Sequence, residues 1–126
     1  MAAKKPILIV DDDEDIRETL RDALSFEGYE TVTTNNGAQA LEYLKKSDEL
    51  PGLIILDLMM PVMDGSKFIE IINSEYKDSL AKIPLILATA KGSHTNVPSS
   101  ELAHERIKKP IELDDLYSIV NKYCAD

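Results

Sequence analysis

The sequence predicts an α/β fold in which a doubly wound, five-stranded parallel sheet is covered by helices on both faces. Short apolar runs rich in β-branched residues alternate with segments of helical periodicity, which is typical of repeated strand–helix units. The runs are apolar at nearly every position, as expected for parallel strands that are buried on both faces. The alternation of strands and helices implies right-handed crossovers and a parallel sheet covered on both faces.

The first strand–helix unit lies between residues 7 and 28. The run Ile7 to Val10 is wholly apolar and predicts the first strand. A helix is predicted from Glu14 to Gly28, a glycine typical of a helix C-terminus. Its apolar positions have a mostly helical spacing: Ile16, Leu20, Ala23, Leu24 and Phe26.

The second and third units follow the same order. Residues 29–34 predict a strand, and the turn at 35–37 leads into a helix. After Pro51 and Gly52, residues 53–56 predict the third strand, which ends at Asp57. The apolar residues of the two helices are Ala40, Leu41 and Leu44, and then Phe68, Ile69, Ile71 and Ile72.

The last two units are less regular. Residues 85–88 predict the fourth strand and residues 106–108 a short fifth strand. Between them, residues 93–100 contain Pro98 and small polar residues, so we expect the fourth helix to be short or disordered. The final helix is marked by Leu113, Leu116, Ile119, Val120 and Tyr123.

Length and composition indicate one soluble globular domain over residues 1–126, with a core of about residues 6–124. The 23 acidic and 14 basic residues give a net charge of -9, which disfavours direct binding to nucleic acid or to anionic membranes. No apolar run approaches the roughly 20 residues of a membrane span. The single cysteine, Cys124, allows no internal disulfide, so we expect a cytoplasmic location.

Polar residues follow four of the predicted strands. In doubly wound sheets, ligands bind beyond the carboxyl ends of the strands. If the first and third strands are neighbours, the carboxylates of Asp11, Asp12 and Asp57 lie within a few ångströms of one another. Carboxylates this close repel, and a hard divalent cation such as Mg²⁺ relieves the repulsion. The pattern therefore predicts a Mg²⁺ site at this edge.

The same edge carries the groups that a phosphoryl transfer needs. A carboxylate such as that of Asp57 is a nucleophile when the charge on the transferred group is neutralised. Mg²⁺ and Lys109 supply that neutralisation, and the Thr89 hydroxyl is a donor to a phosphoryl oxygen. Singly, each residue has a simpler interpretation as a solvated or structural side chain. Their agreement at four strand ends favours a site.

The chain resembles the receiver domain of bacterial response regulators over nearly its whole length. The motifs that carry the resemblance are ILIVDDD at residues 7–13, DLMMPVMDG at residues 57–65, Ala88-Thr89-Ala90, and Lys109-Pro110. The resemblance implies a flavodoxin-like fold with strand order 2-1-3-4-5. It implies a switch that catalyses its own phosphorylation and slow dephosphorylation. Because 126 residues leave no room for an output domain, we expect a stand-alone receiver that is a phosphorelay shuttle or a diffusible effector, unless the chain is a fragment of a longer regulator.

The resemblance also assigns roles to the site residues. Asp57 is the phosphorylated residue, and Asp12, Asp57 and the main-chain carbonyl of Met59 bind Mg²⁺ directly, with Mn²⁺ as a substitute. Asp11 assists through water. The main-chain N–H groups of Met59 and Ala90 bind the phosphoryl group.

Signal transmission in the family involves a hydroxyl and an aromatic side chain. The resemblance makes Thr89 the switch hydroxyl and pairs Lys109 with the phosphoryl group. Arg106 stands where family members usually carry Tyr or Phe, so the aromatic part of the switch is missing. We expect residues 91–105 to be mobile and to become ordered on phosphorylation.

The partners that the resemblance implies are proteins. The phosphoryl donor is a phosphohistidine on a histidine kinase or a histidine phosphotransfer protein, and the signal passes by protein–protein binding to an unknown downstream target. We expect a monomer that binds neither nucleic acid directly nor membranes.

Three alternatives remain open. Asp11, Asp13 and Asp15 resemble the DxD motif of aspartate-nucleophile phosphatases. The second alternative is a hydrolase of small phosphate esters, which needs the same groups. The third is a pseudo-receiver, which keeps the fold only as a protein-binding scaffold. An EF-hand is rejected, because Ile16 stands where the calcium loop requires glycine.

Overall fold

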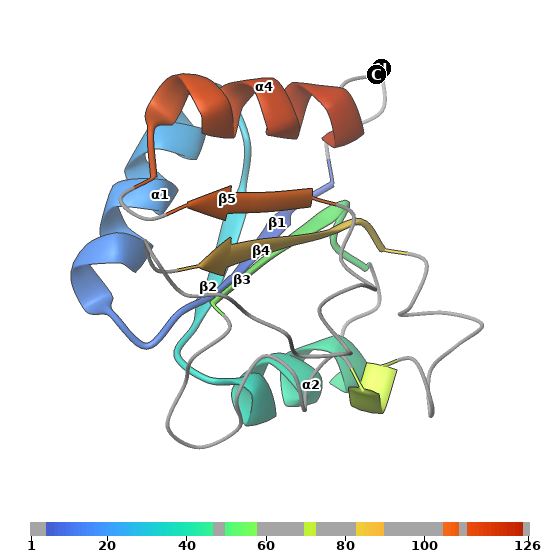
Figure 1. Cartoon of the computed structure of the whole chain (residues 1–126). Coiled ribbons are helices and arrows are strands. Elements are labelled where there is room, and N and C mark those ends of the chain that lie inside the picture. Colours follow the sequence, from blue (N-terminus) through green and yellow to red (C-terminus); the bar gives the residue numbers. More distant parts are fainter. Residues whose placement is uncertain are drawn as a thin grey trace.

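A five-stranded parallel sheet forms the centre of the molecule (Figure 1). The computed structural model describes residues 5–46, 50–57, 70–72, 83–89, 105–108 and 111–124. The strands are β1 (Ile7–Val10), β2 (Thr31–Thr34), β3 (Leu53–Asp57), β4 (Leu85–Thr89) and β5 (Glu105–Lys108). All neighbouring pairs are parallel, and the order across the sheet is β2-β1-β3-β4-β5. The predicted flavodoxin-like, doubly wound fold and its strand order are therefore confirmed.

Helices cover both faces of this sheet. The helices α1 (Glu14–Phe26) and α4 (Leu113–Cys124) lie on one face, and α2 (Gly37–Lys46) lies on the other (Figure 1). Residues 70–72 are helical and add Ile72 to the α2 side, in agreement with the predicted third helix. The region predicted to hold a short or disordered fourth helix lies outside the described residues. No helix within the described ranges has the length and apolarity that a membrane crossing requires.

The alternation of side chains along β1 divides the core into two halves. Ile7 and Ile9 pack in the half that contains α1 and α4. Leu8 and Val10 pack in the half that contains α2. All four side chains are completely buried. A strand with a hydrophobic core on each side must be apolar at every position, which explains the unbroken apolar run in the sequence.

Helix α1 begins and ends at specific capping residues. The Asp13 side chain accepts hydrogen bonds from the first turn of the helix and is its N-cap. At the other end, the N–H groups of Gly28 and Tyr29 donate to the carbonyls of Ser25 and Leu24, which is a Schellman motif. Gly28 has φ of 89°, as this motif requires. The predicted cap at Gly28 is confirmed.

Phe26 does not belong to the buried face of α1. Leu20 and Leu24 are buried, but Phe26 is 88% exposed. Two residues along a helix correspond to a rotation of about 200°, so a side chain at position 26 points away from the core that Leu24 enters. Counting Phe26 with the apolar face was therefore wrong.

We expect Gly28→Ala to lower the free energy of unfolding by about 1–2 kcal/mol, because a β-carbon is strained at positive φ. Chemical denaturation followed by circular dichroism measures this change. Ser25→Ala, on the exposed side of the last turn, is the control and should change stability by less than about 0.5 kcal/mol. Equal effects of the two substitutions would contradict the assignment of the cap.

Helix α2 is capped in a similar way and carries an ion pair on its exposed side. The Asn36 side chain accepts the N–H of Gln39 at 2.8 Å, and the Gln39 side chain accepts the N–H of Asn35. Lys46 Nζ donates to Glu42 Oε1 at 2.6 Å. This hydrogen bond, and then the charge of Lys46, lowers the pKa of the Glu42 carboxyl below its usual value. The predicted apolar face is buried through Ala40, Leu41 and Leu44.

Candidate functional site

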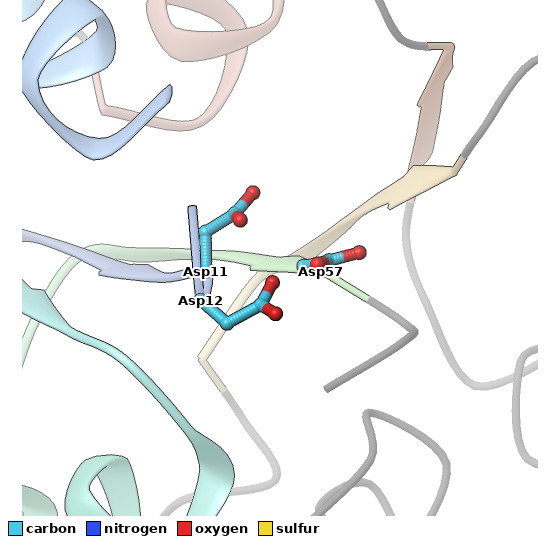
Figure 2. Close-up of side chains that lie close together, drawn as sticks. All are labelled: Asp11, Asp12 and Asp57. Atoms are coloured by element: carbon cyan, nitrogen blue, oxygen red, sulfur yellow. The ribbon is translucent and has the colours of Figure 1, made fainter. Parts of the chain in front are cut away.

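Three carboxylates come together at the carboxyl ends of β1 and β3. Asp11 and Asp12 directly follow β1, and Asp57 is the last residue of β3. The two strands are neighbours with Val10 opposite Leu56, so the residues after them lie at the same edge of the sheet. One carboxylate oxygen from each aspartate lies within 4.8 Å of the other two. Figure 2 shows the three side chains grouped beside the end of β3. The convergence expected from the sequence is present.

The three aspartates differ in their access to solvent. Asp11 is 2% exposed and Asp57 is 7% exposed, whereas Asp12 is exposed. Burying a carboxylate is unfavourable unless cations or hydrogen-bond donors compensate for the lost hydration. The cluster therefore combines two buried acidic side chains with one that faces solvent, and an ion from solution has access on the side of Asp12.

The connection from β1 to α1 is short and held by hydrogen bonds. It consists of residues 11–13. The Asp11 N–H donates to the Thr34 carbonyl of β2 at 3.1 Å, which extends the pairing with that strand. The Asp11 carboxylate accepts the Asp13 N–H at 2.9 Å. The Asp13 carboxylate in turn accepts the N–H groups of Asp15 and Ile16. These bonds fix the path of the chain beside the acidic cluster.

Arg17 also contacts this connection, and the sequence did not single it out. Its side chain is half-buried, and its Nη1 donates to the main-chain carbonyl of Asp11 at 2.8 Å. An arginine among the acidic residues of an amphipathic helix is typical of a solvated side chain, so the pattern contained no signal for this contact.

The other predicted site residues are only partly described. Thr89 is the last residue of β4, and β4 pairs with β3 so that Ala88 lies opposite Asp57. Arg106 lies on β5 opposite Leu87. The side chains of Thr89 and Arg106 lie outside the described part of the chain. The same is true of all atoms of Met59, Ala90 and Lys109.

The ligand set fits a hard divalent cation. Three carboxylates offer oxygen atoms within 4.8 Å of one another. Mg²⁺ and Mn²⁺ prefer oxygen ligands, whereas zinc sites are usually built from cysteine and histidine. Mg²⁺ commonly takes one or two carboxylates and completes its shell with water and phosphate oxygens. The site is therefore suited to bring a metal ion and a phosphoryl group to Asp57.

Comparisons of sequence identify the family. The sequence model of the family described as response regulator receiver domain matches residues 7–121 of the chain. The chain is 36% identical to the regulatory protein AtoC of Escherichia coli (strain K12) over 124 residues, which are 97% of this chain. The matched region is 26% of AtoC, so the chain spans about a quarter of that relative's length.

Comparisons of structure agree with this result. A putative response regulator from Chloroflexus aurantiacus J-10-fl superposes with a TM-score of 0.84 at 28% identity, covering 98% of this chain and 99% of the other. The response regulator TrrA from Thermotoga maritima, solved in complex with Mg²⁺-BeF, has a TM-score of 0.80 at 36% identity, covering 94% and 98%. Both matches extend over nearly the whole chain. The chain therefore belongs to the response regulator receiver domain family.

Proposed function

We propose that this receiver domain accepts a phosphoryl group on Asp57 in a Mg²⁺-dependent reaction and relays the signal by binding another protein. The observation that carries the proposal is the group of three carboxylate oxygens within 4.8 Å at the carboxyl edge of the sheet. A structure of the similar protein TrrA contains Mg²⁺-BeF. The proposal assigns a Mg²⁺ site of the same kind to this chain.

In the proposed reaction, the Asp57 carboxylate attacks the phosphorus atom of a phosphohistidine. The new O–P bond forms as the P–N bond breaks, and the electron pair leaves with the imidazole nitrogen, which takes up a proton. When bound, Mg²⁺ neutralises negative charge on the phosphoryl oxygens. Asp12, Asp57 and the main-chain carbonyl of Met59 would hold the ion, and Asp11 would act through water.

The remaining predicted residues have supporting roles in this proposal. Lys109 pairs with a phosphoryl oxygen, and the main-chain N–H groups of Met59 and Ala90 donate to the phosphoryl group. Thr89 supplies the switch hydroxyl, and its position at the end of β4, beside the end of β3, supports this role. Arg106 occupies the switch position on β5. We propose that residues 91–104, which lie outside the described part of the chain, become ordered when the phosphoryl group is present. Glu105, which the sequence analysis counted with this segment, is the first residue of β5.

The proposed partners follow from the same reaction. A histidine kinase or a histidine phosphotransfer protein supplies the phosphohistidine, and an unknown protein target receives the signal. The 126 residues act as a single receiver domain, monomeric and cytoplasmic, and bind neither nucleic acid nor membrane directly. The net charge of -9 supports the proposed lack of binding to nucleic acid and membrane, because an acidic surface repels nucleic acid and anionic lipid.

The proposal is tested with acetyl phosphate, a small phosphoryl donor. Incubation with Mg²⁺ should add one phosphoryl group per chain, as measured by intact mass. In EDTA, incorporation should be slower by about 100-fold, because the metal contributes several kcal/mol to such transfers. Slow hydrolysis afterwards distinguishes a switch from a hydrolase, which would release phosphate continuously. A chain that gains no phosphoryl group under any condition would contradict the proposal and favour a protein-binding scaffold.

A further inference from the structure

The carboxylate of Asp12 takes its direction from the main chain. Its side chain is exposed, and no residue in the described part of the chain donates a hydrogen bond to its carboxylate. Asp11 is different, because its carboxylate accepts the Asp13 N–H. The position of the Asp12 carboxylate within the cluster therefore depends on how the peptide before it is oriented.

Arg17 holds that peptide. The carbonyl of Asp11 and the N–H of Asp12 belong to one planar peptide unit that ends at the Asp12 α-carbon. Arg17 Nη1 donates to this carbonyl at 2.8 Å. A hydrogen bond from a charged donor is among the stronger ones, and here it limits rotation of the whole plane.

The base of the Arg17 side chain is itself fixed. The Arg17 N–H donates to the Asp13 carbonyl at 3.0 Å, which is the first hydrogen bond of α1. The Asp13 side chain caps the same turn. The main chain runs from Asp11 through Asp13 into α1, and the Arg17 side chain hydrogen-bonds back to the Asp11 carbonyl. Arg17 therefore links the first turn of the helix to the residue that follows β1.

We infer that Arg17 is a positioning residue for the metal site, which orients the Asp12 carboxylate toward the bound cation by fixing the Asp11–Asp12 peptide. The inference rests on the proposed Mg²⁺ site and adds a residue to it. Arg17 does not touch the ion or the phosphoryl group.

If Arg17 acted only through its positive charge, its removal would change the affinity for Mg²⁺ in the opposite direction. Removing a positive charge near a bound dication strengthens cation binding, because a repulsion is lost. Removing a residue that orients a ligand weakens binding, and such changes typically cost 10- to 100-fold in metal affinity. The half-buried guanidinium is partly screened by solvent, so we expect the loss of orientation to exceed the gain from charge.

The test measures Mg²⁺ affinity by isothermal titration calorimetry at fixed pH and ionic strength. Arg17→Met keeps most of the aliphatic stem and should raise the Mg²⁺ Kd by about 10-fold. Arg17→Lys keeps one donor and the charge, and should raise it by only about 2- to 3-fold. The matched control is Arg21→Met, one turn further along α1, where the guanidinium is half-exposed and lies 3.7 Å from Asp22. Its Kd should stay within about 2-fold of wild type.

Two further measurements separate positioning from a general loss of structure. Melting temperatures in EDTA show whether each variant is folded, and Arg17→Gln, with the same expected change in Kd, replaces Arg17→Met if that variant does not fold. In the acetyl phosphate reaction, the half-saturating Mg²⁺ concentration of Arg17→Met should rise by about 10-fold. Its rate at saturating Mg²⁺ should stay within about 3-fold of wild type.

The outcomes distinguish this inference from the proposed function. If wild type binds Mg²⁺ and the folded Arg17 variant binds it equally well or more tightly, the role of Arg17 is overturned and the metal site stands. Equal weakening by the Arg17 and Arg21 substitutions also overturns it, because the effect then does not depend on the hydrogen bond from Arg17 to the Asp11 carbonyl. If wild type binds no Mg²⁺, both proposals fall.

Discussion

Replacing Asp57 with asparagine is expected to reduce phosphoryl incorporation from acetyl phosphate by more than about 100-fold. The amide has nearly the shape of the carboxylate, but it has no anionic oxygen to attack phosphorus. Asp57 lies at the end of a strand whose side chains are all buried, so the substitution removes the nucleophile from a site that the sheet holds in place. Intact mass measured over time in the presence of Mg²⁺ gives the rate.

The control for this variant is Asp22→Asn, which makes the same chemical change on an exposed position of α1 and should leave the rate unchanged. Peptide mapping of the phosphorylated wild type should locate the added mass in the segment that contains Asp57. If Asp57→Asn is folded and is modified as fast as wild type, another residue is the acceptor and the proposed function fails at its central step.

The second large effect is expected for Asp12→Asn, which should weaken Mg²⁺ binding by about 100-fold. Mg²⁺ sites in proteins usually depend on one or two carboxylates, so the loss of one negative ligand removes a large part of the attraction. In EDTA the same variant should melt about 1–2 °C higher than wild type, because one charge leaves the repulsive cluster and Asp12 is exposed enough for the effect to be small.

Asp13→Asn is a closely matched control for Asp12→Asn. It removes the same charge at the next position, and asparagine is as good an N-cap as aspartate, so α1 keeps its first turn. Calorimetric titration should show less than about a 3-fold change in Mg²⁺ Kd for Asp13→Asn. A similar loss of affinity in both variants would mean that general negative charge, and no specific ligand at position 12, attracts the ion.

The positions of β1 and β3 followed from the sequence because both strands are buried on both faces. The runs at 7–10 and 53–56 have no polar residue, and both are strands in the structure, with Asp57 included in β3. The second strand begins later than predicted, at Thr31. Tyr29 is buried, but its N–H donates to Leu24 in the cap of α1. β2 therefore starts further along the chain because Tyr29 belongs to the cap of α1, which the pattern of apolar residues does not reveal.

The different duties of three consecutive aspartates were not predictable from their pattern. In the structure, Asp11 is buried, Asp12 is exposed in the cluster, and Asp13 caps α1. These differences depend on hydrogen bonds to main-chain atoms, and the residue types alone do not specify them. The Arg17 contact was missed for the same reason. The roles of Met59, Ala90, Thr89, Arg106 and Lys109 remain predictions.

The connection between β1 and α1 is only three residues long, and the strand and the helix that it joins are both packed in the hydrophobic core. The connection therefore cannot change length without moving one of them. Its start is bonded to β2 through the Asp11 N–H, and its end is the N-cap of α1. An inserted or deleted residue has to be absorbed by turning the helix by about 100° or by breaking the cap. Turning the helix would carry Leu20 and Leu24 out of the core. This segment therefore tolerates changes of side chain far better than changes of length, and its residue count is under stricter constraint than its composition.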